Sequence, residues 1–241
     1  MLLTDSNYNI WGYPRVGSSY YQCALSLALE SKFKEISLVG ELFSFGPKSK
    51  ISGTFDERLK RYFDYCDSEI PYIFKIFPKQ FIEKRTGTAD WLSITDKIYK
   101  APNTVNILLY REDLLDTLLS YLIMHVEGTR KTRSKDFYNS LPPIEISDSV
   151  LTTRLNDLRK SIDQIHTLSD RYKFDYIIKY EDLKGAPHLD FPEHITSDFK
   201  SKYGITTPLK MNSLKYKKKI LPYKKIQDTF YTYFTDRKLT L

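Results

Sequence analysis

The sequence predicts an α/β fold with a central parallel sheet and helices on both of its faces, in three layers. Short runs rich in Ile, Val, Phe and Tyr alternate along the chain with longer amphipathic runs, and this alternation is typical of βαβ units. Most of the strand-like runs lack a strict polar–apolar alternation, as expected for strands that are covered on both faces. A length of 241 residues suits one domain, so we expect a single domain over residues 1–241.

The expected elements follow one another without a repeat or a linker. Strands are predicted at residues 9–13, 35–39, 72–77, 105–110 and 175–179. Helices are predicted at residues 18–30, 56–67, 89–99, 113–126, 148–172 and 224–234. The polar and basic residues 127–143 are expected to form a long loop or lid. Ligands of such a sheet bind beyond the carboxyl ends of its strands, so the residues that follow each strand are the candidates for chemistry.

Composition and charge restrict the class of protein. The formal charge is +7 and the pI is about 9.1, which favours anionic partners such as nucleotides, nucleic acid or acidic glycans. The lysines that crowd near the C-terminus are interpreted as a solvated basic face. Cys23 and Cys66 form no pattern, and we expect reduced thiols. No signal peptide or membrane-spanning run is evident, so a soluble cytoplasmic protein is expected.

The stretch after the first predicted strand has the spacing of a phosphate-binding loop. Residues 12–20 read GYPRVGSSY, whereas the triphosphate loop reads G-x-x-x-x-G-K-[ST]. Ser18 stands where that loop has its lysine, and Arg15 is the cation in the middle of the loop. The amides of residues 16–19 are expected to point at one anion at a helix N-terminus. The alternative is an ordinary strand–helix turn in which serine caps the helix.

A second anion site is predicted after the fourth strand. Arg111 follows that strand, and Ser120 lies in the next predicted helix. A guanidinium group in this position can hold a phosphate through two hydrogen bonds. The alternative is an arginine that pairs with Glu112 or Asp113 at the start of the helix.

Together these stretches resemble the motifs of the sulfotransferase family. Residues 12–20 are similar to the family's 5′-phosphosulfate loop, Y-P-[KR]-x-G-[ST]-[ST], and residues 109–121 are similar to its 3′-phosphate motif. KYEDL at residues 179–183 matches an element that follows a late strand in many members. The three stretches occur in the family's order. The resemblance implies a P-loop-like sulfotransferase architecture and transfer of a sulfuryl group from 3′-phosphoadenosine 5′-phosphosulfate to a hydroxyl of a glycan, lipid or small molecule.

The resemblance also implies the donor site. The residues expected to contact the donor, and its product adenosine 3′,5′-bisphosphate, are Arg15, Val16, Gly17, Ser18, Ser19, Tyr20, Arg111 and Ser120. No metal is expected, because a phosphosulfate carries less charge than a triphosphate. Two features depart from the family pattern. The family's arginine and serine are eight positions apart, whereas Arg111 and Ser120 are nine positions apart. The family's C-terminal Arg-Lys-Gly is absent, so residues 216–218 (Tyr-Lys-Lys) are an alternative 3′-phosphate contact.

The catalytic base is expected at Glu41. Many members have a Lys-x-His pair after the third strand, and here the lysine is Lys75 but Phe77 replaces the histidine. Glu41 follows the second strand in GELF, which resembles the segment that supplies the glutamate base in glycan- and trehalose-type sulfotransferases. Glu41, Arg15 and Lys75 are therefore the predicted catalytic residues. The alternative for Glu41 is a surface glutamate or a partner of Arg15, and His125 is interpreted as a core residue.

Two other functions stay open at the level of sequence. One is a small-molecule kinase with an aberrant phosphate-binding loop, against which the missing lysine argues. The other is a polyanion- or nucleic-acid-binding protein that uses the basic C-terminus. This function leaves the order of the three motifs unexplained, so nucleic acid is not favoured as a partner. The sequence identifies neither the hydroxyl acceptor nor the oligomeric state.

Overall fold

The computed structural model describes residues 6–30, 35–44, 52–82, 91–127, 143–183 and 220–235. The chain divides into two compact units. The first unit comprises Met1–Tyr110 and Gln164–Ile178, and the second comprises Arg111–Asp163 and Lys179–Leu241. The expectation of a single domain over residues 1–241 stays a prediction.

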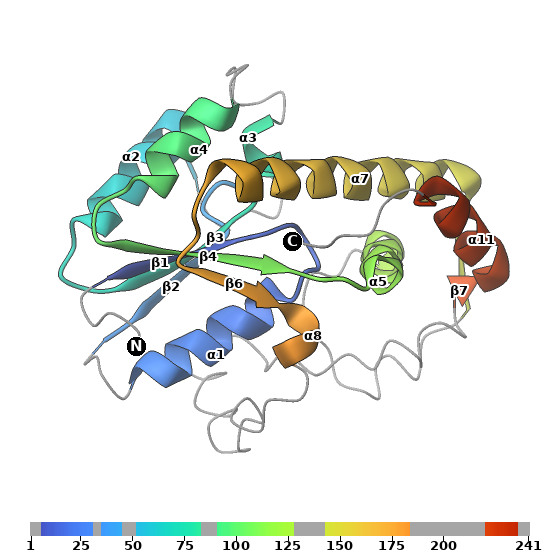
Figure 1. The fold of residues 1–241 in the computed structure, drawn as a ribbon, viewed down its shortest axis with the longest axis horizontal. Coiled ribbons are helices and arrows are strands. Elements are labelled where there is room, and N and C mark those ends of the chain that lie inside the picture. The colour runs from blue at the N-terminus through green and yellow to red at the C-terminus, as the bar shows by residue number, and fades with distance from the viewer. Residues whose placement is uncertain are drawn as a thin grey trace. The chain divides into compact units, whose positions relative to one another are not determined.

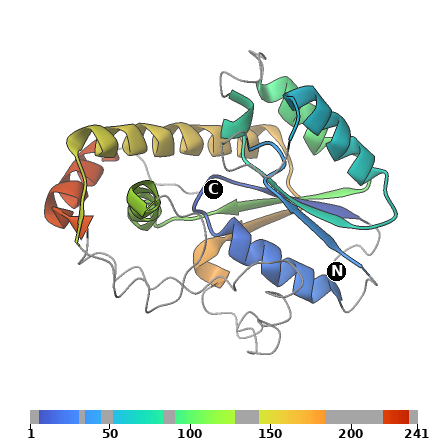
Figure 2. The same cartoon turned by 180° about the vertical axis from the view of Figure 1, so that it is seen from behind.

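The first unit is built on a five-stranded parallel sheet with the order β2-β3-β1-β4-β6. Figure 1 shows helices on both faces of this sheet, as Figure 2 does from behind: α1 covers one face, and α2 and α4 cover the other. The predicted α/β fold with a central parallel sheet and flanking helices is therefore confirmed. The strands are β1 (Asn7–Trp11), β2 (Ser37–Gly40), β3 (Tyr72–Ile76), β4 (Thr104–Tyr110) and β6 (Tyr176–Lys179).

The helices of the first unit begin and end close to their predicted bounds. They are α1 (Ser18–Glu30), α2 (Phe55–Cys66), α3 (Lys79–Ile82), α4 (Trp91–Tyr99) and the last part of α7 (Asp148–Arg171). The start of α2 follows from a capping box, in which the Thr54 hydroxyl accepts from the Glu57 amide and the Glu57 carboxylate accepts from the Thr54 amide. The short helix α3 was not predicted.

A buried hydrogen-bond network joins the two central strands to the helices above them. Asn9 of β1 and Asn106 of β4 lie opposite each other, and Asn9 Nδ2 donates to Asn106 Oδ1 over 3.2 Å and to the Tyr62 hydroxyl over 2.8 Å. The indole of Trp11 donates to the same Asn106 oxygen over 2.8 Å. Burial, the largest cause, raises the pKa of Tyr62 well above its ordinary value, which keeps the hydroxyl neutral. The network is satisfied on several sides, as buried polar groups must be.

The second unit combines a small two-stranded sheet with several helices. Strand β5 (Ile144–Glu145) pairs in parallel with β7 (Ile220–Leu221). The Lys225 ammonium of α11 (Tyr223–Tyr233) contacts the Asp148 carboxylate at the start of α7 at 2.6 Å. The other elements of this unit are α5 (Leu114–Glu127) and α8 (Tyr180–Leu183). Strands β5 and β7 were not predicted.

Two strands of the structure, β1 and β4, begin before their predicted first residues. Strand β1 begins two residues before the predicted start because Asn7, a residue type that is depleted in strands, is buried and donates to the Cys66 carbonyl. The expected loop or lid at residues 127–143 lies outside the described residues except for its two ends.

Within the described ranges, no helix is both long and apolar enough to cross a membrane.

The end of α7 is held against α4 by a carboxylate. Asp96 of α4 accepts from the Tyr172 hydroxyl at 2.5 Å and from the Arg171 guanidinium at 2.8 Å. These two hydrogen bonds, with Tyr172 the larger cause, hold the pKa of Asp96 below its ordinary value of 3.8.

We predict that Asp96→Asn makes the stability of the protein less dependent on pH at acid pH. A carboxyl group with a lowered pKa contributes stability that is complete above its ordinary pKa and is lost as the pH falls through its folded pKa. The measurement is the free energy of unfolding between pH 2 and pH 6, with the exposed Asp170→Asn as control. If the free energy of unfolding of Asp96→Asn falls at acid pH as much as that of the wild type does, this contact contributes nothing to the pH dependence.

Candidate functional site

The carboxyl end of β1 lies at a switch point of the sheet. The chain leaves β1 for α1 on one face, and it leaves the neighbouring β3 for α3 and α4 towards the other face. Where two adjacent parallel strands send their connections to opposite faces, a crevice forms beyond their carboxyl ends, and ligands of open α/β sheets bind there. The candidate site is therefore expected after β1 and β3.

The loop between β1 and α1 has an unusual backbone conformation. Arg15 and Gly17 both have positive φ angles, of 71° and 90°. A non-glycine residue in this region costs about 1–2 kcal/mol, so the surrounding contacts must hold Arg15 there. A Cβ atom on Gly12 would lie 2.9 Å from the Leu109 carbonyl oxygen, which shows how closely the loop approaches β4. The loop is thus a tight turn that lies close against β4.

The predicted donor residues of this loop lie around the start of α1. Val16 is buried and its amide donates to the Tyr13 carbonyl over 3.3 Å, so that amide serves the turn. Ser18 is the first residue of α1 and is buried, whereas Ser19 is exposed. The first intrahelical bond runs from Tyr21 to Gly17, so the amides of residues 18–20 have no partner one turn before them in the helix. Nothing is described of the Tyr20 side chain.

Two predicted catalytic residues meet beside this loop. Lys75 on β3 donates to the Ser19 hydroxyl over 3.1 Å, and its Nζ lies 3.7 Å from Oε1 of Glu41. The Lys75 side chain is 11% exposed and that of Glu41 is 34% exposed, so the lysine is largely buried while the carboxylate is reachable. Ser19, Lys75 and Glu41 come from three different elements and form one cluster.

The register of the strands explains this cluster. Strands β2 and β3 are parallel, and the pairing shifts by one residue so that Gly40 lies opposite Phe74. The next residue of each strand is therefore Glu41 on one side and Lys75 on the other. Strand β1 pairs with β3 on its other edge, with Ile10 opposite Lys75, which brings the loop after β1 to the same end of the sheet.

Two further side chains position Glu41 or the segment that follows it, and neither side chain was predicted. Gln80 of α3 donates from Nε2 to Glu41 Oε2 over 3.2 Å. Arg58 of α2 donates to the carbonyls of Leu42 and Ser44, over 3.2 and 2.7 Å, and thereby fixes the segment that follows Glu41. Gln80 lies just after a predicted strand, so the rule that such residues carry the chemistry applies to it as well. No sequence pattern singles out Arg58.

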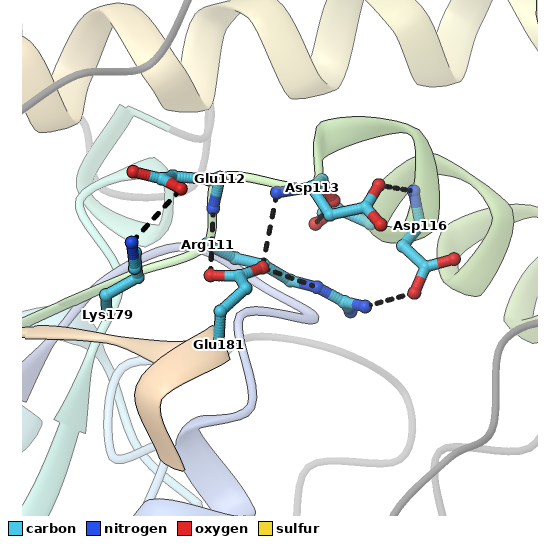
Figure 3. Close-up of polar contacts among 7 residues, drawn as sticks. Arg111, Glu112, Asp113, Asp116, Lys179 and Glu181 are labelled. Carbon is cyan, nitrogen blue, oxygen red and sulfur yellow. Dashed lines mark hydrogen bonds and ion pairs between the residues drawn. The ribbon is translucent and has the colours of Figure 1, made fainter. Parts of the chain in front are cut away.

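Arg111, the predicted 3′-phosphate ligand, belongs to the second unit and is surrounded by carboxylates (Figure 3). Its Nη2 donates to Asp116 Oδ2 at 2.5 Å, and its Nε lies 3.8 Å from Glu181 Oε1. The guanidinium also lies over the Tyr180 ring, 4.8 Å from its centre. The side chain of Arg111 is 7% exposed and that of Asp116 is 1% exposed, so the pair is buried.

Glu181 organises the turn between Arg111 and α5. Its two carboxylate oxygens accept hydrogen bonds from the amides of Glu112 and Asp113, each over 3.2 Å, while Lys179 pairs with Glu112 at 3.2 Å (Figure 3). The KYEDL stretch at residues 179–183 thus stabilises the turn that follows Arg111. The alternative drawn from the sequence, an arginine paired with a carboxylate near the start of the helix, thus has Asp116 and Glu181 as the partners of Arg111.

Ser120 lies on α5, one helical turn after Asp116. It is buried, and residues four apart on a helix share a face, so it belongs to the side of α5 that carries the partner of Arg111. The alternative 3′-phosphate contact at residues 216–218 lies outside the described residues. The structure therefore brings together Ser19, Lys75 and Glu41 in the first unit, and Arg111 and Asp116 in the second.

Comparison with known proteins adds no relative. No protein-family model matches the sequence, and no curated protein matches it.

We predict that Arg111→Ala destabilises the protein whatever its effect on ligands. Removing the guanidinium leaves the Asp116 carboxylate buried without a counter-ion, which costs about 3–5 kcal/mol of unfolding free energy. Denaturant unfolding measures the loss. The control is Lys224→Ala, whose exposed pair with Asp228 is expected to change the stability little. An Arg111→Ala protein of wild-type stability would show that this ion pair has no structural role.

Proposed function

We propose that the protein is a sulfotransferase that moves a sulfuryl group from 3′-phosphoadenosine 5′-phosphosulfate to an acceptor hydroxyl. The observation that carries the proposal is the cluster of Ser19, Lys75 and Glu41 beside the tight loop after β1. A carboxylate, an ammonium group and a tight loop lie together at one switch point, and this supports the proposal because such a transfer needs a base, a cation and a site for the anion. The fold is compatible with a P-loop-like architecture.

In the proposed reaction the loop holds the 5′-phosphosulfate. The amides at the start of α1 and the helix dipole favour the anion. Arg15 contributes charge and hydrogen bonds, because a guanidinium cannot give up its proton at ordinary pH. The Lys75 ammonium has three N–H donors, and one of them donates to the Ser19 hydroxyl. The ammonium charge stabilises the negative charge that develops on the phosphate oxygen as its bond to sulfur breaks.

Glu41 is the proposed general base. The acceptor oxygen forms a bond to sulfur as the bond between sulfur and the bridging phosphate oxygen breaks, and the hydroxyl proton passes to the Glu41 carboxylate. Adenosine 3′,5′-bisphosphate leaves with the electron pair of the broken bond. Gln80 and Lys75 hold the two oxygens of Glu41, and its partial exposure leaves room for an acceptor.

A different group is expected to hold the 3′-phosphate of the donor. Arg111 is the expected ligand, but Asp116 and Glu181 already neutralise its charge. A phosphate would have to compete with two carboxylates, unless those side chains rearrange when the nucleotide binds. Binding experiments with nucleotides that differ only in the 3′-phosphate separate this question from the transfer chemistry.

We predict that adenosine 3′,5′-bisphosphate stabilises the protein more than 5′-AMP does. A ligand present at 100 times its dissociation constant adds about 2.7 kcal/mol to the free energy of unfolding. Melting temperatures with each nucleotide, and with ATP and Mg²⁺ as the test of the kinase alternative, measure the difference. Equal shifts for the two adenosine nucleotides would remove the 3′-phosphate site, and a larger shift with ATP and Mg²⁺ would favour the kinase.

We predict that Glu41→Gln keeps the affinity for adenosine 3′,5′-bisphosphate and loses most transfer activity. Glutamine is nearly isosteric but cannot take up a proton, and loss of a general base costs roughly 10²–10⁴-fold in rate. The assay follows transfer from the donor to a panel of sugars, lipids and phenols.

The matched control is Glu145→Gln, which changes an exposed carboxylate in the second unit. It is expected to keep both affinity and activity. Near-normal turnover by Glu41→Gln would assign the base to another group.

A further inference from the structure

The two edges of the central sheet differ in how well they are protected against further pairing. Strand β2 forms one edge and β6 the other, and among the described residues β4 is the only strand that pairs with β6 (Figure 1). The four residues of β2 are half-buried. The pairing of β2 with β3 shifts between Leu38 and Gly40, and irregularities of this kind keep an edge from pairing with another chain.

Strand β6 exposes apolar side chains instead. Ile177 is 53% exposed and Tyr176 is 38% exposed. The strand reads Tyr-Ile-Ile-Lys, without proline or glycine, and its only charged residue is the last one, Lys179. An exposed edge strand of this composition is a template for pairing with another strand.

A hydrogen bond at the start of β6 indicates which of its backbone groups face away from β4. The Asp175 amide donates to the Asn106 carbonyl of β4 over 3.0 Å. Backbone groups of successive residues in a strand point to opposite sides, so those of Ile177 face β4 and those of Ile178 face the edge. A strand that adds to this edge therefore forms its hydrogen bonds with Ile178 and with the residue two positions before it.

We propose that β6 pairs in antiparallel orientation with β6 of a second copy of this chain, about a two-fold axis at Ile177. In this register Ile177 lies opposite Ile177 of the second copy, and Tyr176 lies opposite Ile178. The pair of Tyr176 and Ile178 occurs twice and is of the hydrogen-bonded kind, as the direction of the backbone groups requires. The pairing is independent of the chemistry proposed for Glu41.

Apolar contact and charge both favour a second copy as the occupant of this edge. The two Ile177 side chains form a close, non-hydrogen-bonded pair of the ladder, so each covers the most exposed apolar side chain of the other strand. On the same face the register places Asp175 opposite Lys179 of the second copy, on both sides of the axis. Opposite charges directly across an antiparallel pair stabilise it.

These two charged groups keep their partners within the chain. Asp175 Oδ2 accepts from the Asn106 amide over 2.7 Å. Lys179 pairs with Glu112 at 3.2 Å. A carboxylate has a second oxygen and an ammonium group has three donors, so both groups are able to serve the new contact as well. Because β6 is only four residues long, the dimer is expected to dissociate on dilution.

The experiment measures self-association of the full chain by sedimentation equilibrium over a dilution series. The test variant is Ile177→Lys, which sets two ammonium groups opposite each other at the axis. The matched control is Tyr231→Lys, because Tyr231 is 56% exposed and lies on α11. We expect the wild type and the control to approach twice 28.4 kDa at the concentrated end. Like charges directly opposite destabilise a strand pair, so Ile177→Lys raises the dissociation constant by about tenfold or more.

A cysteine cross-link tests the register. In Ile177→Cys the two Cα atoms are about 4.5 Å apart across the axis, which is within the range of a disulfide. In Tyr176→Cys the two cysteines lie diagonally, roughly 7–8 Å apart, which a disulfide does not span. The wild type, which has Cys23 and Cys66, is the blank. We expect mild oxidation to convert Ile177→Cys to a covalent dimer at least about tenfold faster than the other two proteins.

A wild type that stays at 28.4 kDa throughout the series overturns the proposal. In that event hydrogen exchange at the Ile178 amide gives the reason: protection assigns the edge to another segment of the same chain, and fast exchange leaves it open to solvent. A dimer that survives Ile177→Lys, or that cross-links no faster through Ile177→Cys than through Tyr176→Cys, uses a different surface and also overturns the proposal. If Ile177→Lys fails to fold, the mass of the wild type and the cross-linking rates decide.

Discussion

The parallel register of β2, β3 and β1 is the constraint on which the candidate site depends. It sets Glu41 next to Lys75 on one edge of β3 and delivers the loop with Ser19 along the other. A shift of one residue in either pairing would turn the side chains of a strand to the opposite face and separate the three groups. The buried Asn9–Asn106 contact secures β1 on its other side, since those two residues lie opposite each other in the β1–β4 pairing. The site is thus a product of strand pairing more than of any local motif.

Local contacts then hold the site in one geometry. Gly12 allows the loop to approach β4, and the positive φ of Arg15 is a conformation that only a well-packed loop keeps. Arg58 donates to carbonyls on both sides of residues 45–52, at Ser44 and at Gly53, so one guanidinium fixes the segment after Glu41 at two points. Burial, the larger cause, together with the nearby Arg61, lowers the pKa of Arg58 from its ordinary value. Through these hydrogen bonds to backbone carbonyls, the buried Arg58 supports the candidate site.

The sequence sufficed for the α/β class and for the five main strands, because their apolar runs are long and alternate with amphipathic helices. It also led to Glu41, which follows a parallel strand, and the resemblance to the sulfotransferase motifs led to Lys75. It did not yield the ion pair of Arg111 with Asp116, because that contact depends on how the turn before α5 is folded. Strands β5 and β7 are two residues each and far apart in the chain, so no periodicity reveals them.

The central claim is that the loop after β1 and Lys75 hold the phosphosulfate end of a nucleotide. A crystal structure of the protein with adenosine 3′,5′-bisphosphate tests it most directly. The account predicts that the 5′-phosphate accepts hydrogen bonds from the amides at residues 17–19, at about 2.7–3.2 Å, with Lys75 Nζ on the side where sulfur would be attached. A nucleotide bound elsewhere, or a 5′-phosphate that does not contact the loop, would contradict it.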